Sequence, residues 1–300
     1  LGGEKGFRMD REAARQAIHD RVAVPLGVSV EAAASAIIRV ANNNMAGRVR
    51  VVSVERGYDP RDFVLVAFGG AGPLHGAALL KETGVAACLV PLYPGVLCAL
   101  GSAAADVRHD FVQTVMKTTD ELDFADLQAT IRRLVTEGKA LIEQEAIPVR
   151  EVAILLDADM AYEGQRHDIR ISLSETVSRR GLEEAFTAAY RAEYGKALDG
   201  IRIRLTTVRA AIVGIRSKPE IGLSKEAAGS LADARTGERQ VYFDDGWYAT
   251  PIYTRRALAV GHHFVGPAIV EQDDTTVVIE PGVSARVDAH RNLVLETVKP

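Results

Sequence analysis

Only two cysteines, Cys88 and Cys98, occur among the 300 residues of the sequence, which excludes the disulfide framework of a small secreted domain. No apolar run approaches the roughly 20 residues that a membrane-spanning helix needs. The net charge is only −4, so the chain lacks the basic surface by which proteins bind nucleic acids or anionic membranes. We therefore expect a cytoplasmic protein that binds neither nucleic acid nor a membrane.

The sequence does contain enough apolar residues for a sizeable core. Hydrophobic residues make up 47% of the chain, and its length suggests about two domains. Residues 1–8 contain no initiator methionine, no signal-peptide pattern and no helix-capping signal. We therefore expect this sequence to be a fragment or a processed subunit of a longer protein.

One stretch combines a buried-strand pattern, a glycine turn and the start of a helix. Residues 63–68 are all apolar, residues 69–72 read Gly-Gly-Ala-Gly, and Pro73 stands where a helix would open. Backbone N–H groups at such a turn can face an anion or a nucleotide, although this kind of turn is more often only a tight connection. It is not a P-loop, because no Gly-Lys-Ser/Thr follows, nor a dinucleotide fingerprint, because the glycine spacing differs.

The apolar pattern predicts an α/β region, then an α+β region, then a β-rich region. Helices capped by Asp10 and Ser29 precede the glycine turn, and the strand, helix and strand around it predict a crossover in a partly parallel sheet. The α+β region has helices and strands at residues 123–145, 152–162, 167–172, 182–194 and 202–216. After Ser217, short strands predict a small β-rich tail domain or sandwich, and residues 224–237 are the expected mobile loop.

Several polar residues could carry chemistry, but each also has a structural explanation. His75 lies in the first turn after the glycines, where it could contact a ligand, although a single helix histidine is usually structural or solvated. Asp106, His109 and Asp110 could be a metal site, although a satisfied turn is the better interpretation. Asp157, Asp159 and Glu163 could be a cation site, although a solvated or salt-bridged strand edge explains them at least as well. Asp273-Asp274-Thr275-Thr276 is most simply a polar turn before a strand.

The remaining candidates are weaker. Cys88 lies in an apolar strand and is expected to be an inert core thiol, whereas Cys98 is more accessible but has no histidine placed in sequence to activate it. His262 and His263 are expected at the surface of a turn. The residues by themselves thus identify no catalytic group and no metal ligand.

Short motifs of a known type are spread along the chain. The most specific is Ala67-Phe68-Gly69-Gly70-Ala71-Gly72-Pro73-Leu74-His75. The others are Leu1-Gly2-Gly3, residues 41–45, 55–61, 93–97, 106–110, 160–165 and 266–271, and Asp274-Thr275-Thr276. Through these motifs the chain resembles, nearly end to end, the C-terminal portion of the hydantoinase/oxoprolinase family of the ATP-dependent N-methylhydantoinase A type.

This resemblance implies an α/β fold, with an RNase H-like half domain of the actin/Hsp70/sugar-kinase type followed by an α+β and β-rich C-terminal region. Residues 1–115 would be the C-terminal half of the ATPase-like domain, and residues 116–300 the C-terminal domain of the family. ATP and Mg²⁺ would be the cofactors, with the first phosphate loop upstream of Leu1. The residues that would contact the nucleotide are Gly69, Gly70, Ala71, Gly72, Pro73 and His75.

The resemblance also implies an activity for the complete protein: ATP-dependent phosphorylation and opening of a hydantoin or oxoproline ring, with this fragment alone inactive. The alternatives are a subunit of an acetone- or acetophenone-type carboxylase, and a subunit-interaction module without activity of its own. The module alternative predicts that deletion after Ser217 abolishes partner binding but spares nucleotide binding. The expected partners are a nucleotide, a small cyclic amide, a hydantoinase B-type subunit or domain and further copies of the chain. Relatives often carry arginine where this chain has Ala161.

Overall fold

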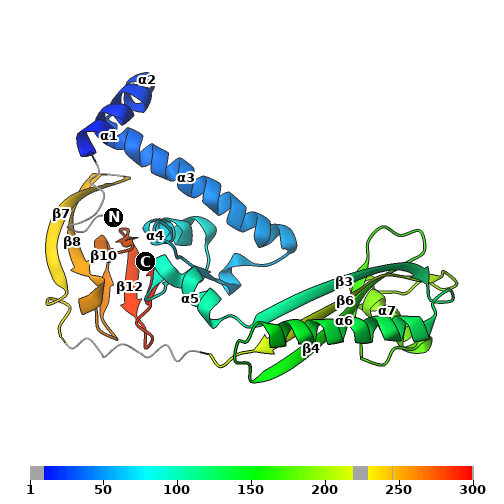
Figure 1. Ribbon diagram of the computed structural model, residues 1–300. Coiled ribbons are helices and arrows are strands. Elements are labelled where there is room, and N and C mark those ends of the chain that lie inside the picture. Colours follow the sequence, from blue (N-terminus) through cyan, green and yellow to red (C-terminus); the bar gives the residue numbers. More distant parts are fainter. Residues whose placement is uncertain (1–9, 219–228, 245, 299–300) are drawn as a thin grey trace. The chain divides into compact units, whose positions relative to one another are not determined.

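The computed structural model describes residues 10–218, 229–244 and 246–298, and it divides into two compact units (Figure 1). Unit 1 comprises Leu1–Ser102 together with Ile221–Pro300, and unit 2 comprises Ala103–Glu220. Unit 2 is therefore inserted in the chain between the two parts of unit 1. These units do not follow the expected division into residues 1–115 and 116–300, which stays a prediction about sequence modules.

Unit 1 begins with helices. Asp10 accepts a hydrogen bond from Ala13 N at 2.9 Å, and Ser29 Oγ accepts one from Ala32 N at 3.1 Å, so both expected caps are confirmed. In order, these elements are α1 (Arg11–Ile18), the π-helical η1 (His19–Ala23), α2 (Val24–Leu26), α3 (Val30–Val52) and the short η2 (Val54–Arg56) and η3 (Pro60–Asp62).

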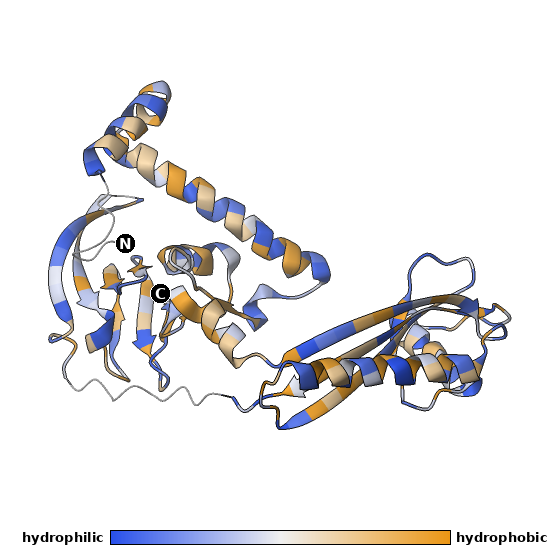
Figure 2. Ribbon diagram, in the orientation of Figure 1, coloured by the Kyte–Doolittle hydropathy of each residue, from blue (hydrophilic) through white to orange (hydrophobic). Residues whose placement is uncertain are grey.

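Helix α3 buries two alanines and one asparagine and leaves several apolar side chains exposed. Ala33, Asn42 and Ala46 are its buried residues, and α3 packs against α4. Exposed apolar side chains include Ile37 and Val40, and Figure 2 shows apolar residues along the length of α3. Small residues let two helices approach closely, so the alanine-rich pattern predicted this contact.

The main sheet of unit 1 has five strands in the order β1-β2-β13-β12-β9. Strands β1 and β2 are parallel, with Leu65 opposite Cys88, which confirms the predicted crossover through α4. Strand β2 then pairs antiparallel with β13, with Cys88 opposite Leu295. The elements are β1 (Val64–Val66), α4 (Gly72–Thr83), β2 (Ala87–Val90), β9 (His263–Val265), β12 (Val283–Val287) and β13 (Leu293–Thr297).

A second sheet of unit 1 has four strands in the order β11-β10-β8-β7. Its core residues belong to the same apolar cluster as those of the first sheet: Val270 and Val277 pack in one cluster with Cys88 and Leu293. The elements are β7 (Arg235–Phe243), β8 (Gly246–Thr254), the short η5 (Arg255–Ala257), β10 (Ala268–Glu271) and β11 (Thr276–Ile279).

The expected β-rich region after Ser217 is therefore present, but it is not a separate tail domain. Three of its strands complete the sheet that β1 and β2 begin, because two short strands alone could not bury Cys88 and Val90 from water. Of the expected mobile loop at residues 224–237, residues 224–228 lie outside the described residues. Residues from Arg235 onward form β7.

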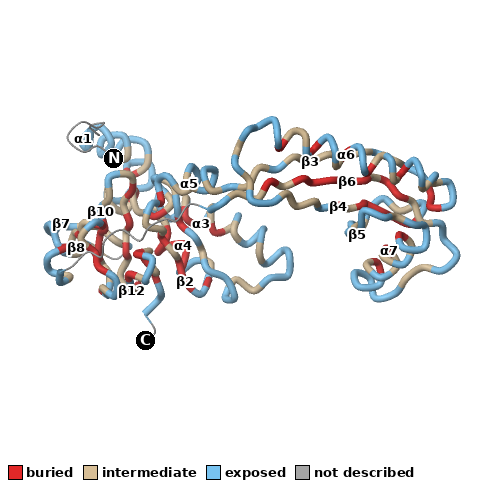
Figure 3. The backbone as a smooth tube through the Cα atoms, turned by 60° about the horizontal axis from the view of Figure 1, so that its bottom comes forward, coloured by how far each residue is buried: buried red, intermediate tan, exposed pale blue. Residues whose placement is uncertain are grey.

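Unit 2 is an antiparallel sheet in the order β3-β6-β4-β5 with two helices. Residues of both helices share one core cluster with the sheet, including Ile131 of α6, Phe186 of α7 and Ile212 of β6, and Figure 3 shows buried residues along β6. The elements of unit 2 are β3 (Val107–Thr118), α6 (Phe124–Gln144), β4 (Glu151–Tyr162), β5 (Ile169–Ser172), α7 (Arg179–Tyr194) and β6 (Ile203–Ile215). Before them, η4 (Pro94–Val96) belongs to unit 1, and α5 (Leu97–Ala104) crosses the boundary between the units.

Within the described residues, no single helix is both long and apolar enough to cross a membrane. Only the bent pair Arg11–Leu26 and Val30–Arg56, which meets at 90°, reaches that length and composition when both parts are taken together.

The mixed α/β fold class expected from the sequence is confirmed.

Candidate functional site

The glycine turn connects the end of β1 to the start of α4. Gly69 has a φ of +81°, a left-handed conformation that glycine adopts without strain. Helix α4 follows Ala71, which has no side-chain oxygen to cap it, so the first backbone N–H groups lack the usual side-chain acceptor. Gly70 and Ala71 are exposed. A ligand can therefore reach these donors, and an anionic ligand would also be stabilised by the helix dipole.

Two distant segments hold the glycine turn in place. Gly69 N donates to Pro94 O at 2.8 Å, and Thr275 Oγ1 donates to Gly70 O at 2.9 Å. These contacts bring together three motifs that are far apart in the sequence: the glycine turn, Tyr93-Pro94-Gly95 and Asp274-Thr275-Thr276. The site is thus built from both parts of unit 1.

Asp274 is the side chain that links two of these motifs. Its Oδ2 accepts a hydrogen bond from Gly95 N at 2.9 Å, while its Oδ1 is buried and has no hydrogen-bond partner in the described part of the chain. A Cβ atom added to Gly95 would lie only 2.2 Å from Asp274 Oδ2, so only glycine allows this approach. Asp274 therefore joins the Tyr-Pro-Gly motif to the turn before β11, and its second carboxylate oxygen is buried without a partner.

The sequence reasoning missed Asp274, because Asp-Asp-Thr-Thr before a strand reads as a polar turn. That description of the local structure is correct, since Asp274 lies in the turn between β10 and β11. The signal that could have identified it was its presence in one of the quoted motifs beside the Tyr-Pro-Gly and glycine motifs.

His75 has a structural partner. Its Nδ1 lies 2.7 Å from Oδ1 of Asn42, a buried residue of α3. Because a carbonyl oxygen only accepts hydrogen bonds, this contact places the proton on Nδ1 and leaves Nε2 available for other contacts. The bond ties α4 to α3, so the structural explanation for His75 holds, and its contact with a nucleotide stays a prediction.

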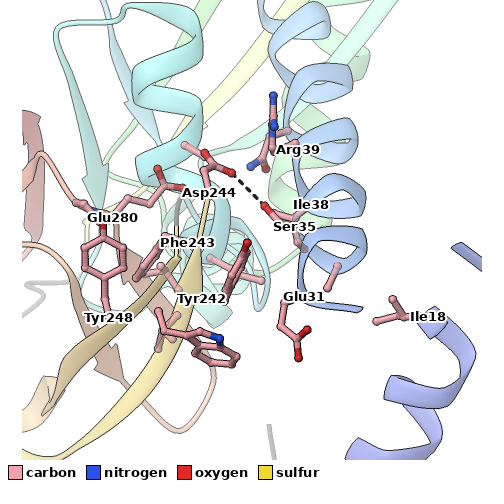
Figure 4. A pocket seen from close by; sticks show the side chains of 18 of the residues that line it. Ile18, Glu31, Ser35, Ile38, Arg39, Tyr242, Phe243, Asp244, Tyr248 and Glu280 are labelled. Carbon is pink, nitrogen blue, oxygen red and sulfur yellow. Dashed lines mark hydrogen bonds between the residues drawn. The ribbon is translucent and has the colours of Figure 1, made fainter. Parts of the chain in front are cut away.

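A cavity of about 680 Å³ lies in unit 1 along α4, between α1, α3 and the β7–β8 hairpin. Figure 4 shows Ser35 and Asp244 pointing toward each other across it, and Ser35 Oγ donates to Asp244 Oδ1 at 3.0 Å. Asn42, the partner of His75, is in its wall. Aromatic and apolar side chains form much of the remaining cavity wall, among them Tyr242, Phe243, Trp247 and Ile38.

The acidic cluster of unit 2 is salt-bridged. Asp159 accepts hydrogen bonds from Arg170 at 2.9 Å and from Arg209 at 2.6 Å. Burial raises the pKa of Asp159, but the two arginines outweigh it and hold that pKa below its usual value. Glu163 pairs instead with Arg202 at 2.8 Å. Glu163 comes directly after the last residue of β4. Within β4, a register shift after Asp159 breaks the alternation of side chains between the two faces of the sheet.

The other sequence candidates also have local partners. Asp106 pairs with Lys218 at 2.6 Å, Asp110 with Arg108 at 2.8 Å, and His109 Nε2 lies 2.8 Å from Glu145. Asp106, His109 and Asp110 lie on or next to β3, and each pairs with a different residue. Their side chains therefore do not converge on one point. In the described residues no group of three or more His, Cys, Asp or Glu side chains is arranged to hold a metal ion.

The cysteines and the histidine pair behave largely as expected. Cys88 is fully buried, and burial raises the pKa of its thiol to about 12, whereas Cys98 is exposed. His263 is exposed, but His262 is half-buried: its Nε2 lies 3.0 Å from Gly229 O, and its Nδ1 accepts from Ala259 N. His262 is thus a structural residue and not a free surface side chain.

Comparison with known proteins decides which family contains this arrangement. The family model described as hydantoinase/oxoprolinase matches residues 2–111, and the model described as hydantoinase/oxoprolinase C-terminal domain matches residues 116–298. The chain belongs to the hydantoinase/oxoprolinase family. The resemblance stated from the sequence motifs is confirmed.

Known proteins and solved structures match nearly the whole chain. It is 37% identical to the uncharacterized protein MJ0964 of Methanocaldococcus jannaschii, over 97% of this chain and 41% of that protein. It is 30% identical to caprolactamase subunit alpha of Pseudomonas jessenii, over 96% of this chain and 42% of the relative. The nucleotide-free structure of acetone carboxylase superposes with a TM-score of 0.81 at 27% identity, over 98% of this chain and 44% of that one. The chain thus spans less than half the length of these relatives.

Proposed function

We propose that this chain is the C-terminal part of an ATP-dependent enzyme of the hydantoinase/oxoprolinase family and that its glycine turn contacts the nucleotide. The observation that carries the proposal is the junction of the glycine turn with the Tyr-Pro-Gly and Asp-Thr-Thr motifs around the uncapped start of α4. Relatives of known structure are titled as ATP-dependent enzymes, the acetone carboxylase and the caprolactamase of Pseudomonas jessenii. The proposed contacts are those of Gly69, Gly70, Ala71, Gly72, Pro73 and His75.

The residues present suit a nucleotide. Exposed backbone N–H groups at a helix start can donate to phosphate oxygens. Asp274 supports them from behind, because its Oδ2 holds Gly95 N of the neighbouring Tyr-Pro-Gly motif. Mg²⁺ would accompany ATP, but the described residues offer no cluster of ligands for it. We therefore assign binding and orientation of the nucleotide to this chain and no step that involves the metal ion.

The reaction we propose for the complete enzyme is the opening of a cyclic amide such as a hydantoin or 5-oxoproline. A ring amide is stable because its carbonyl carbon is a poor electrophile. ATP transfers a phosphoryl group to the amide oxygen and leaves as ADP, which makes the ring carbon more electrophilic. Water then adds to this carbon and the C–N bond breaks, with the ring nitrogen leaving as an amine. A second water molecule releases inorganic phosphate from the resulting acyl phosphate and leaves the carboxylate. In this scheme the glycine turn holds the nucleotide in a fixed position, since correct placement is a large part of phosphoryl-transfer catalysis.

A second candidate is an ATP-dependent carboxylase subunit, which would phosphorylate a ketone enol or bicarbonate instead. The TM-score of 0.81 to acetone carboxylase favours it. Purified complete enzyme, measured for ATP hydrolysis with hydantoin, with 5-oxoproline and with a ketone plus bicarbonate, separates the two. Stimulation by the ring substrates supports the amidohydrolase, and stimulation that requires both ketone and bicarbonate supports the carboxylase.

The nucleotide site is tested by Gly70→Val in the complete enzyme. A Cβ at Gly70 would make only an ordinary contact, 3.6 Å from Asp274 O, so the fold should tolerate it while a bound nucleotide would meet the new side chain. We expect the dissociation constant for ATP, measured by calorimetry, to rise at least about ten-fold, a loss of about 1.4 kcal/mol. Gly237→Val is the matched control, because Gly237 lies in β7 with no atom within 4 Å of an added Cβ. Unchanged ATP affinity in Gly70→Val would exclude the turn as a nucleotide contact.

We also infer a partner subunit, because the caprolactamase relative is named as a subunit alpha. A cytoplasmic location and association with further copies of the chain stay predictions from the sequence. The partner would be a hydantoinase B-type chain. Co-purification of the complete protein with such a chain, followed by mass determination of the complex, measures both associations. The 300-residue chain alone is expected to show no ATP turnover stimulated by substrate. Such turnover would contradict the proposal that this chain binds the nucleotide while the first phosphate loop lies upstream of Leu1.

A further inference from the structure

Two arginine side chains lie buried beside one another in unit 1. Arg255 is in η5 and only 2% exposed, and Arg291 is in the turn between β12 and β13 and 7% exposed. Arg255 Nη2 donates to Arg291 O at 2.6 Å, and Arg291 Nη2 donates to Arg256 O at 3.1 Å. The acceptors that these two cations have in the described structure are thus backbone carbonyl oxygens, which carry no net charge.

Three guanidinium nitrogens of this pair have no hydrogen-bond partner. They are Nε and Nη1 of Arg255 and Nε of Arg291, each buried within the described residues. Burial first, and the neighbouring Arg291 second, lower the pKa of Arg255 to about 10, while Asp288 raises it slightly. At neutral pH Arg255 therefore keeps its proton, and deprotonation does not remove the buried charge.

Asp288 does not neutralise the pair by direct contact. Its Oδ1 accepts from His290 N at 2.9 Å and from Asn292 N at 2.7 Å, and its Oδ2 accepts from Asn292 Nδ2 at 3.0 Å. These bonds shape the turn in which Arg291 adopts a φ of +61°. The carboxylate is thus engaged in the turn, and the described residues provide no ion pair for either guanidinium.

A buried cation without a counter-charge is costly, by several kcal/mol for an uncompensated ion, and each unpartnered buried donor adds about 1–3 kcal/mol. Guanidinium groups match oxyanions in both charge and donor geometry. We propose that Arg255 and Arg291 form a binding site for a small oxyanion of the phosphate or sulfate type. The anion would accept hydrogen bonds from unpartnered nitrogens of both arginines and balance the charge of the pair. Because Nε and Nη1 of Arg255 donate from different edges of the guanidinium plane, one anion would contact only one of these two.

This site is linked to the glycine-turn region but does not depend on its function. Asn292 Oδ1 accepts from Leu92 N at 3.2 Å, and Leu92 O accepts from Gln272 Nε2 at 3.0 Å. Leu92 precedes the Tyr-Pro-Gly motif, and Gln272 precedes Asp274. A bound anion would therefore stiffen the two segments that place Asp274 against Gly95, whether or not a nucleotide binds there.

The test is anion-dependent stability and binding of the 300-residue chain. Because sulfate and phosphate stabilise many proteins without a specific site, thermal unfolding in phosphate is compared with unfolding in chloride at equal ionic strength, for the unmodified chain and for variants. Arg255→Met keeps an apolar side chain of similar length, and Arg291→Asn keeps a residue that tolerates positive φ. Arg256→Met is the matched control, because its side chain is 80% exposed and its carbonyl remains.

We expect saturable phosphate binding by calorimetry in the unmodified chain and in Arg256→Met. In Arg255→Met and Arg291→Asn the dissociation constant should rise at least about ten-fold, in keeping with the loss of charged hydrogen bonds, and the phosphate-specific part of the thermal shift should disappear. If either variant fails to fold, titration of the unmodified chain and of Arg256→Met decides. Absence of saturable phosphate or sulfate binding, or an equal response in all variants, overturns the proposal.

Discussion

The two units differ in how the chain assembles them. All four strands and both helices of the unit 2 core come from one continuous segment, residues 107–215. Unit 1 combines the start and the end of the chain: the hydrogen bond from Leu92 N to Asn292 Oδ1, for example, joins residues 200 positions apart. Local sequence patterns therefore describe unit 2 well, whereas the candidate site of unit 1 exists only when its two parts meet.

The largest expected effect is on unit 1, from ending the chain after Ser217. This truncation removes β9, β12 and β13, so Cys88 loses its neighbouring strand β13. We therefore expect the proposed nucleotide site to be lost as well, whereas the interaction-module alternative expects nucleotide binding to be spared. Cys88 is fully buried in the intact chain, where burial raises the pKa of its thiol to about 12. We expect it to become reactive toward a thiol reagent in the truncated chain, as followed by mass spectrometry of the labelled peptide.

The control for that experiment is the segment 103–218, which should retain a cooperative thermal transition because it contains the whole core of unit 2. If Cys88 stays protected in the truncated chain, the first part of unit 1 folds without the C-terminal strands, and the contrast between the units is wrong.

A smaller effect, confined to unit 2, is expected from Gly138→Ala in α6. A Cβ at Gly138 would lie 2.6 Å from Cγ1 of Ile212, and overpacking of this kind costs about 1–3 kcal/mol. Urea unfolding followed by circular dichroism measures the loss, while fluorescence of Trp247, the only tryptophan in the sequence, reports on unit 1 and should not change. Gly101→Ala, in helix α5 of unit 1, controls for the intrinsic preference of alanine over glycine in a helix, since no atom lies within 4 Å of its added Cβ. Equal stability of the two variants would show that α6 can shift away from the sheet.

The smallest effect concerns the acid stability of unit 2. In the folded unit the pKa of Asp159 lies below its ordinary value of 3.8. Its ion pairs therefore contribute fully above about pH 4, and their contribution is lost as the pH falls through the lowered value. We expect Asp159→Asn to destabilise the segment 103–218 by about 1–2 kcal/mol at pH 7, because both arginines are partly exposed.

The difference between Asp159→Asn and the unmodified segment should shrink below pH 4, as measured by urea unfolding at several pH values. Asp157→Asn serves as the comparison, because Asp157 accepts only from Ser172, at 3.2 Å. A difference that stays constant down to pH 3 would mean that Asp159 does not act through its charge.

Much of the local structure could be predicted from the sequence. The caps at Asp10 and Ser29, the parallel pair around α4, and the helices at residues 124–144 and 179–194 follow from apolar periodicity and capping residues close together in the chain. The glycine turn was also identified, together with the family. These features depend on neighbours within a few residues, which a pattern search samples directly.

Only the tertiary structure decided the rest. It showed that β13 pairs with β2, that Asp274 approaches Gly95, and that Arg255 and Arg291 are buried together with guanidinium nitrogens that have no hydrogen-bond partner. In sequence, Asp274 belongs to a polar turn, and the two arginines are ordinary charged residues after a strand and within a turn. Their surroundings come from residues up to 200 positions away, and no local preference of the backbone encodes which distant strands will share a core.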